Sequence, residues 1–274
     1  MKSLTDLFSK SRANDAIELE ALFGDRAQHV VHPDRPGDRS PDDRTIVANV
    51  GEKPWRPICC LSLVFANGAR DENVVGTGIL IAPNVILTAA HNLFSPRTRR
   101  FVKTAHAHVG TNSGAHAASA RIRRVEICPG YSDFADTDIR RYRYDFGVAK
   151  VESNALIDWS GEFLDVANQP PLADDELGRA RLNVAGYPAE QGPPKLKSDS
   201  GGVLRDTISP ANFRYRMDTT AGQSGGPVFR YMADSQQVTY AGVHVGGDSR
   251  GNIARRFDAA MQNRVKEWLQ GFQA

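Results

Sequence analysis

The first candidate for chemistry is a serine flanked by glycines, in the stretch GQSGGPV over residues 222–228. The hydroxyl of Ser224 could attack a carbonyl carbon if a base took its proton. The glycines on either side permit a tight turn that presents the hydroxyl and directs backbone N–H groups towards one point, as an oxyanion requires. The same residues also suit a glycine-rich turn with a solvated serine, so the rest of the chain has to decide.

A base and an acid that could activate Ser224 occur earlier in the chain. His91 follows the apolar stretch VILTAA at 85–90, which places the imidazole at the end of an expected strand. Asp145 stands at the start of the apolar strand expected in YDFGVAK at 144–150, where surface decoration explains an acid poorly. Taken singly, each could be an ordinary residue at a strand end. Together, in the order His, Asp, Ser, they suit a nucleophile, its base and the acid that orients the base.

The composition excludes several classes of protein. The chain has 274 residues, of which 41% are hydrophobic and 24% charged, as is ordinary for a soluble globular protein. Its net charge of +2 is too small to argue for nucleic acid or an anionic membrane as a partner, and no apolar stretch is as long as a membrane span. The N-terminal stretch lacks the continuous apolar segment of a secretory signal. The protein is therefore cytoplasmic, or it is secreted and the sequence begins after a removed signal.

The cysteines and histidines give little indication of disulfides or of a metal site. Cys59, Cys60 and Cys128 make a poor disulfide framework, because their number is odd and two of them are adjacent. His106 and His108 share one face of a strand, but no cysteine or carboxylate pair supports them as ligands. We therefore predict no metal site and no cofactor.

The chain divides into an N-terminal arm over residues 1–44 and a domain over 45–274. The arm contains a predicted helix over Asp15–Phe23, capped by Asn14, and a run rich in Pro, Asp, Arg and Gly over 32–44. This composition is typical of a propeptide, a docking arm or a linker.

The domain has the pattern of an all-β protein with one helix at its end. From Thr45 onwards, short apolar stretches rich in Val and Ile alternate with turn residues, which predicts a barrel or a sandwich. The exception is the segment over Asp258–Phe272, where apolar residues recur at helical spacing. These residues are Met261, Val265, Trp268 and Leu269.

The three motifs, taken in order, resemble those of the chymotrypsin-like serine proteases. GTGILI at 76–81 and VILTAAH at 85–91 cover the strand before the histidine, and the resemblance extends over about 45–270. It implies two six-stranded antiparallel β-barrels with the active site between them, followed by a C-terminal helix. It also implies a serine endopeptidase acting on polypeptides. In such an enzyme His91 is the general base, Asp145 orients it, Ser224 is the nucleophile, and the N–H groups of Gly222 and Ser224 form the oxyanion hole.

Four stretches resemble the glutamyl endopeptidases within that superfamily. They are SPDDRTIVAN at 40–49, VAGYP at 184–188, DTTAGQSGGPVF at 218–229 and AGVHVGG at 241–247. The chain departs from that family at Gly226, where serine is usual, and at Ala221, where glycine is usual. The resemblance implies that Thr219 and His244 line the S1 pocket and hydrogen-bond a substrate carboxylate. It also implies that Val245, Gly246 and Gly247 pair with the substrate backbone.

Two interpretations of the substrate preference compete. Asp218 stands six residues before Ser224, where trypsin-like enzymes keep the carboxylate that binds Lys or Arg, and alone it predicts cleavage after basic residues. Thr219 and His244 favour Glu, then Asp, at the P1 position. The glutamyl endopeptidases also often carry Asp at the position of Asp218. We therefore predict an acidic P1 preference, with trypsin-like cleavage as the alternative.

Two other classes of function compete with a protease. One is a catalytically silent binding module on the same scaffold, although the triad and the oxyanion glycine are all present. The other is a basic surface for an interaction partner, although interleaved Asp133, Asp136 and Asp138 dilute it and favour a solvated face over a nucleic-acid site. The basic surface would consist of Arg121, Arg123, Arg124, Arg140, Arg141 and Arg143.

The residue before the nucleophile bears on activation. Gln223 cannot form the ion pair by which a freed amino terminus activates trypsin-type zymogens.

Overall fold

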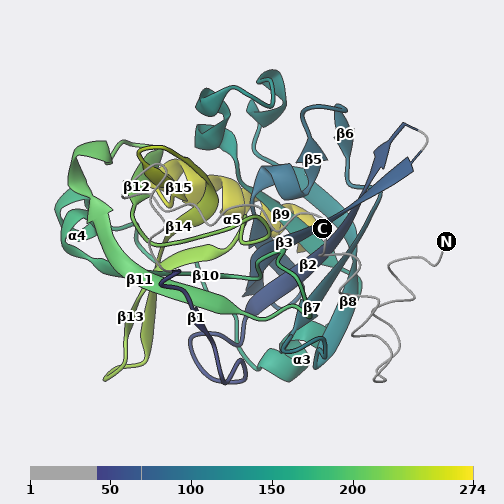
Figure 1. Ribbon diagram of the computed structural model, residues 1–274, viewed down its shortest axis with the longest axis horizontal. Helices are drawn as coiled ribbons and strands as arrows, with labels where there is room; N and C mark the ends of the chain where they lie inside the picture. Colours follow the sequence, from purple (N-terminus) through teal and green to yellow (C-terminus); the bar gives the residue numbers. More distant parts are fainter. Residues whose placement is uncertain (1–41, 69, 274) are drawn as a thin grey trace.

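The apolar stretches form the strands of two antiparallel barrels in the computed structural model, which describes residues 42–68 and 70–273 (Figure 1). The first barrel is closed, with its strands in the order β2-β3-β4-β9-β8-β7. Their bounds are β2 (Ile58–Asn67), β3 (Arg70–Ala82), β4 (Val85–Thr88), β7 (Thr104–Val109), β8 (Ala118–Ile127) and β9 (Gly147–Val151).

The second barrel has six strands in the order β11-β10-β13-β14-β15-β12 and closes where β11 pairs with β12. A short strand, β1, adds to β11, so that Thr45 pairs with Ser198. The bounds are β1 (Thr45–Ile46), β10 (Arg181–Gly186), β11 (Lys197–Leu204), β12 (Asn212–Tyr215), β13 (Pro227–Met232), β14 (Gln237–Asp248) and β15 (Gly251–Arg256). The prediction of two six-stranded antiparallel barrels is confirmed.

Strand β2 shows why a nearly continuous apolar run can still be a strand. Side chains alternate between the two faces of a strand. Cys59, Leu61 and Leu63 point into the hydrophobic cluster of the first barrel. Ile58 and Cys60 belong to a second cluster, which also contains residues of the other barrel. Both faces are buried, so both are apolar, and the contact between the barrels is part of the core.

The C-terminal helix, α5 (Ala259–Gln273), forms where the sequence predicts it and lies near the centre of the view in Figure 1. Asp258 caps it, because its Oδ1 accepts the backbone N–H of Met261 at 2.7 Å. The apolar face of α5 packs on the cluster shared by the barrels, and the Trp268 ring lies 5.6 Å from that of Phe146. The helix thus packs against Phe146, the residue that follows Asp145.

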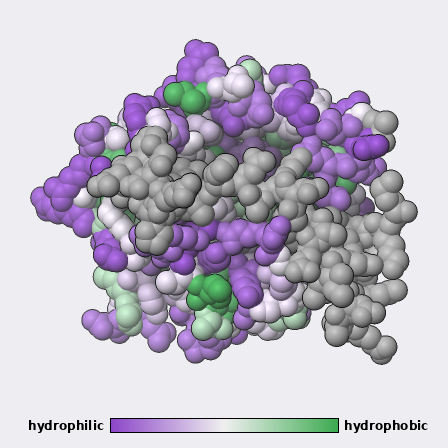
Figure 2. Space-filling view, viewed as in Figure 1, coloured by the Kyte–Doolittle hydropathy of each residue, from purple (hydrophilic) through white to green (hydrophobic). Residues whose placement is uncertain are grey.

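The remaining elements are short. Two helices, α3 (Ala155–Ser160) and α4 (Asp174–Arg179), and a two-stranded sheet of β5 (Phe94–Ser95) and β6 (Arg100–Phe101) lie in connections where the sequence predicted none. The helix predicted over Asp15–Phe23 lies outside the described residues. The described helices include none long and apolar enough to cross a membrane. The described surface visible in Figure 2 is mostly hydrophilic, with hydrophobic residues in small separate patches.

Candidate active site

His91 and Asp145 come together because β4 and β9 are neighbouring strands. Thr88, at the end of β4, pairs with Gly147, at the start of β9. His91 follows just beyond Thr88, and Asp145 lies just before Gly147. The Asp145 carboxylate accepts the backbone N–H of His91 through Oδ1 at 3.0 Å and contacts the imidazole Nδ1 through Oδ2 at 2.8 Å.

The burial of the pair determines which imidazole nitrogen is available. Asp145 is fully buried, whereas 24% of the His91 side chain is exposed. An ionised carboxylate can only accept hydrogen bonds, so the imidazole proton resides on Nδ1. Nε2 is then left as the acceptor on the exposed side of the ring.

The backbone of the serine loop (residues 220–226) has space only for glycine at three positions. Gly222 has a φ of +92°, and an added Cβ would lie 2.5 Å from Ala189 N and from Tyr187 O. At Gly225 φ is +85°, and an added Cβ would lie 2.2 Å from Thr77 O. At Gly226 an added Cβ would lie 2.2 Å from Ala185 O. That contact gives a physical reason for glycine here, where the glutamyl endopeptidase pattern has serine.

Two residues of the first half of the chain anchor the serine loop. Thr77 donates its backbone N–H to Ser224 O at 2.9 Å and its hydroxyl to Gly222 O at 2.8 Å. Asn92 donates its side-chain amide to Ser224 O at 2.8 Å. Sequence reasoning missed both residues, although a polar residue inside GTGILI and one directly after His91 were signals that could have found them.

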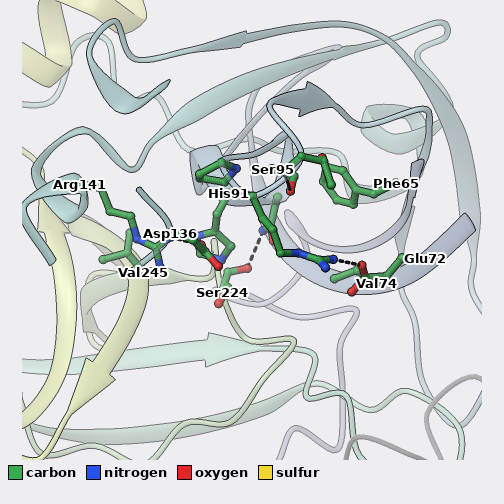
Figure 3. Close-up of a pocket in the computed structure, with 13 residues that line it drawn as sticks. Phe65, Glu72, Val74, His91, Ser95, Asp136, Arg141, Ser224 and Val245 are labelled. Atoms are coloured by element: carbon green, nitrogen blue, oxygen red, sulfur yellow. Dashed lines mark hydrogen bonds and ion pairs between the residues drawn. The ribbon is translucent and has the colours of Figure 1, made fainter. Parts of the chain in front are cut away.

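A cleft of about 350 Å³ contains both His91 and Ser224 (Figure 3). In Figure 3, Asp136, Arg141 and Val245 lie to one side of this pair, and Glu72 and Val74 to the other. Of the residues expected to bind substrate, Val245 lines the cleft, at an irregularity in the pairing of β14 with β15. The lining residues are Phe65, Glu72, Val74, His91, Asn92, Ser95, Pro96, Arg97, Thr98, Asp136, Arg141, Ser224 and Val245.

Of the other predicted substrate-binding residues, His244, Gly246 and Gly247 lie in β14, and Thr219 lies in the loop between β12 and β13. Thr219 and His244 are buried, and the His244 carbonyl accepts the N–H of Gly225 at 2.8 Å. Gly246 and Gly247, which follow Val245, pair with β15. These four residues are not among those that line the cleft.

His244 has a buried partner that sequence reasoning missed. Its Nδ1 lies 2.6 Å from the hydroxyl oxygen of Tyr215. Burial, and then the charge on nearby His91, lower the pKa of His244 from its usual 6.5 to about 3. Burial also raises the pKa of Tyr215 well above its usual value. Both side chains are therefore neutral at neutral pH, and Tyr215 retains the proton for the hydrogen bond with His244.

The carboxylate of Asp218 is hydrogen-bonded to the segment that precedes β1. Its Oδ2 accepts the backbone N–H of Asp43 at 3.0 Å, and only 5% of the residue is exposed. The backbone N–H of Asp218 donates to Asp199 at 2.7 Å. The next residue of the same segment, Arg44, is buried beneath the serine loop, where it donates to Gln223.

Comparison with known proteins places this geometry in a family. The family model for the trypsin-like peptidase domain matches residues 76–234, more than half of the chain. The chain belongs to the trypsin-like peptidase family. The match includes His91, Asp145 and Ser224, and it runs from within β3 to just beyond the end of β13.

Two curated relatives of this trypsin-like peptidase come from Bacillus. The extracellular metalloprotease of Bacillus subtilis is 24% identical over 230 residues, which cover 83% of this chain and 68% of that protein. The glutamyl endopeptidase of Bacillus licheniformis is 27% identical over 242 residues, which cover 85% of this chain and 69% of that protein. Among the described residues of this chain, no three His, Cys, Asp or Glu side chains gather as a metal site would need.

Solved structures share the fold. A Glu endopeptidase in complex with MPD superposes with a TM-score of 0.66 at 26% identity, covering 83% of this chain and 97% of that one. The protease Anisep from Arthrobacter nicotinovorans gives a TM-score of 0.60 at 19% identity, covering 80% of this chain and 96% of that one. This trypsin-like peptidase thus has the chymotrypsin-like fold, and these likenesses support peptidase activity.

Proposed function

We propose that this peptidase is a serine endopeptidase that uses His91, Asp145 and Ser224 as its catalytic triad. The observation that carries the proposal is the 2.8 Å contact between the His91 imidazole and Asp145, made by a histidine that shares a cleft with Ser224. The hydroxyl attacks the scissile carbonyl carbon of a bound polypeptide, and Nε2 of His91 takes its proton. Asp145 holds the imidazole in the tautomer that leaves Nε2 free and stabilises the imidazolium that forms.

The negative charge that develops on the substrate oxygen needs donors. No hydrogen bond among the described residues uses the N–H of Gly222 or of Ser224. These two N–H groups are the proposed oxyanion hole. As the C–N bond breaks, His91 returns the proton to the leaving amine, and a water molecule then hydrolyses the acyl-enzyme by the same steps.

We further propose a preference for Glu, then Asp, at P1. In this proposal Tyr215 donates to Nδ1 of His244, 2.6 Å away, which leaves the imidazole proton on Nε2 for donation to a substrate carboxylate. Because burial keeps His244 neutral at neutral pH, this contact begins as a hydrogen bond and gains charge only if the bound carboxylate raises the imidazole pKa. The hydroxyl of Thr219 is the second proposed donor to the substrate carboxylate. Val245, Gly246 and Gly247 bind the substrate backbone as an added strand.

The alternative, cleavage after Lys or Arg, depends on Asp218. The contact of its carboxylate with the N–H of Asp43 argues against it, because that oxygen is already used within the protein. The glutamyl endopeptidases among the relatives and the solved structures favour the acidic preference as well.

The arginines of the predicted basic surface support a solvated face rather than a nucleic-acid site. Ion pairs neutralise several of them locally, at distances from 2.6 to 3.0 Å. These pairs join Arg123 to Glu152, Arg124 to Glu126 and Arg140 to Asp138, and Arg141 also pairs with Asp136.

Covalent labelling tests the proposed mechanism. A fluorophosphonate should modify Ser224 in the wild-type protein and leave Ser224→Ala unlabelled, with the site identified by peptide mass spectrometry. A binding module would leave the wild type unlabelled at a concentration that labels a known serine protease. That outcome would refute the enzymatic proposal.

Substrate preference is measured separately, with peptides that differ only at P1. Wild type should cleave after Glu, then Asp, and His244→Ala should lose that preference while Asp218→Asn keeps it. Cleavage after Arg that disappears in Asp218→Asn and persists in His244→Ala would overturn the acidic preference and leave the triad proposal intact.

A further inference from the structure

A buried guanidinium lies directly beneath the serine loop. The side chain of Arg44 has no exposed surface, although it belongs to the segment that precedes β1. Its Nη1 donates to Thr220 Oγ1 at 2.9 Å and to Gln223 Oε1 at 2.7 Å. Arg44 therefore hydrogen-bonds the loop at two residues, Thr220 near its start and Gln223 directly before the nucleophile.

Gln223 lies in the chain between Gly222 and Ser224, whose N–H groups are the two proposed oxyanion donors. The N–H of Gly222 precedes it in the chain and the N–H of Ser224 follows it, so the backbone of Gln223 sets the angle between them. Its side chain is fully buried, and Oε1 accepts both the Arg44 guanidinium and the N–H of Thr220, the latter at 3.0 Å. The amide nitrogen of Gln223 is buried without a partner among the described residues, so the bonds to Oε1 are what orient the side chain.

Acidic partners on the other side of Arg44 hold it in place. Nε donates to Asp42 Oδ1 at 2.8 Å, and Nη2 pairs with Glu190 at 2.5 Å. Lys197 then bridges to Glu190 at 2.8 Å. The side-chain hydrogen bond from Arg44 is the main cause that lowers the pKa of Asp42 to about 2. Because the guanidinium is buried, leaving it without these carboxylates would be costly, so they hold it in one position.

We propose that Arg44 is a positioning residue for catalysis, which holds Gln223 so that the N–H groups of Gly222 and Ser224 converge on the substrate oxygen. This inference rests on the proposed serine endopeptidase function. Arg44 touches neither substrate nor reacting atoms and acts through Gln223. The segment 42–44 is then a part of the catalytic apparatus, supplied from outside both barrels.

The test uses the full chain and compares Arg44→Ala with a matched control, Arg256→Ala. Arg256 is also buried in the second barrel, where it pairs with Asp174 and donates to the carbonyls of Ser209 and Leu172, away from the serine loop. Both variants should lower the melting temperature. Only Arg44→Ala should lower kcat, by about 10- to 100-fold, somewhat less than the loss of a whole oxyanion donor. KM should change little, and the rate of fluorophosphonate labelling should fall with kcat.

Two further measurements separate positioning from folding. Millimolar guanidinium should restore part of the kcat of Arg44→Ala and leave that of Arg256→Ala unchanged. Arg44→Lys should retain more activity than Arg44→Ala, because an ammonium can replace one of the donors. If Arg44→Ala does not fold, Gln223→Met decides, because it removes Oε1 while keeping a side chain of similar length, and the same loss of kcat is expected.

The outcomes are distinguishable from those that test the proposed function. If the wild type is labelled at Ser224 but Arg44→Ala keeps its kcat within about twofold, or loses no more than Arg256→Ala, the positioning role is wrong. The same holds if Arg44→Ala does not fold and Gln223→Met keeps its kcat. An unlabelled wild type would instead refute the enzymatic proposal on which the inference rests.

Discussion

The two barrels bury different kinds of polar group. In the first barrel the buried polar residues are uncharged apart from Asp145, and His108 lies between the hydroxyls of Ser62 and Ser119. In the second barrel and the segment attached to it, buried charges are common. They are Arg44, Asp218, Arg255 and Arg256.

This difference follows from how each barrel presents its share of the active site. His91 and Asp145 are held by the ends of two adjacent strands, whose pairing is regular backbone hydrogen bonding. Ser224 stands on a loop instead, and a loop has no ladder to fix it. Thr77 and His244 make backbone hydrogen bonds with this loop. Side chains from distant segments add to them, from Arg44 on one side and from Thr77 and Asn92 on the other. Directional side-chain contacts therefore supplement a few backbone hydrogen bonds where the nucleophile is placed.

The largest expected effect comes from removing one group from each side of the cleft. Ser224→Ala and His91→Ala should each lower kcat by about 10⁴- to 10⁶-fold, and the double variant should be no worse than the more damaging single one. The reason is that the hydroxyl and the imidazole act as one unit. Peptide hydrolysis by purified variants measures this. Losses that multiplied in the double variant would mean that the two barrels contribute independently.

The next effect tests the strand-end geometry of the first barrel. Asp145→Asn should lower kcat by about 10⁴-fold while preserving the fold, because an amide favours the wrong imidazole tautomer. Circular dichroism and kcat are measured together. Asp133→Asn is the control and should retain activity. A variant Asp145→Asn with near wild-type rates, alongside a loss in Asp133→Asn or Asp138→Asn, would show that another acid serves His91.

Truncation tests whether the second barrel needs the segment before β1. Deleting residues 1–39 should leave a folded, active domain, because Asp42 and Arg44 remain with their partners. Deleting residues 1–44 should lower kcat by about the 10- to 100-fold expected for Arg44→Ala. The two proteins are compared by thermal unfolding and by kcat. If the shorter deletion already melts far lower, residues 1–39 of the predicted arm (1–44) are integral to the fold.

The smallest expected effect concerns pH. Burial keeps the pKa of His108 well below its usual value and lowers that of His244 to about 3, whereas both would titrate near 6.5 in the unfolded chain. The unfolded state therefore binds more protons below pH 6.5, so the free energy of unfolding should be flat above that pH and fall as the pH drops towards 3. Each histidine contributes at most about 1.4 kcal/mol per pH unit.

Urea unfolding between pH 7.5 and 4 measures this slope. His108→Gln and His244→Gln should each make it shallower, which assigns the acid sensitivity to the first or the second barrel. A slope that neither variant changes would mean that carboxylates, rather than these imidazoles, cause any loss of stability in acid.

Much of the fold could be predicted because its signals are local. The short apolar stretches, the turn residues between them and the helical spacing after Asp258 each reflect the geometry of a single element, and the barrels and α5 formed as predicted. The short helices α3 and α4 were missed, since six residues carry too little periodicity to distinguish them from a loop. The boundary at residue 44 and the triad roles stay predictions.

The sequence by itself determined which residues could do chemistry. Glycine at 222 suits the positive φ found there. A serine beyond it, and a histidine and an acid at strand ends, are residue types that can do the chemistry and can be identified from the sequence. Only the tertiary structure decided what holds them. Closure of the two barrels brings Arg44, Thr77 and Asn92 to one loop and directs the Asp218 carboxylate to the N–H of Asp43. Such partners are far apart in the chain, and no local pattern encodes a contact that exists only once distant strands have paired.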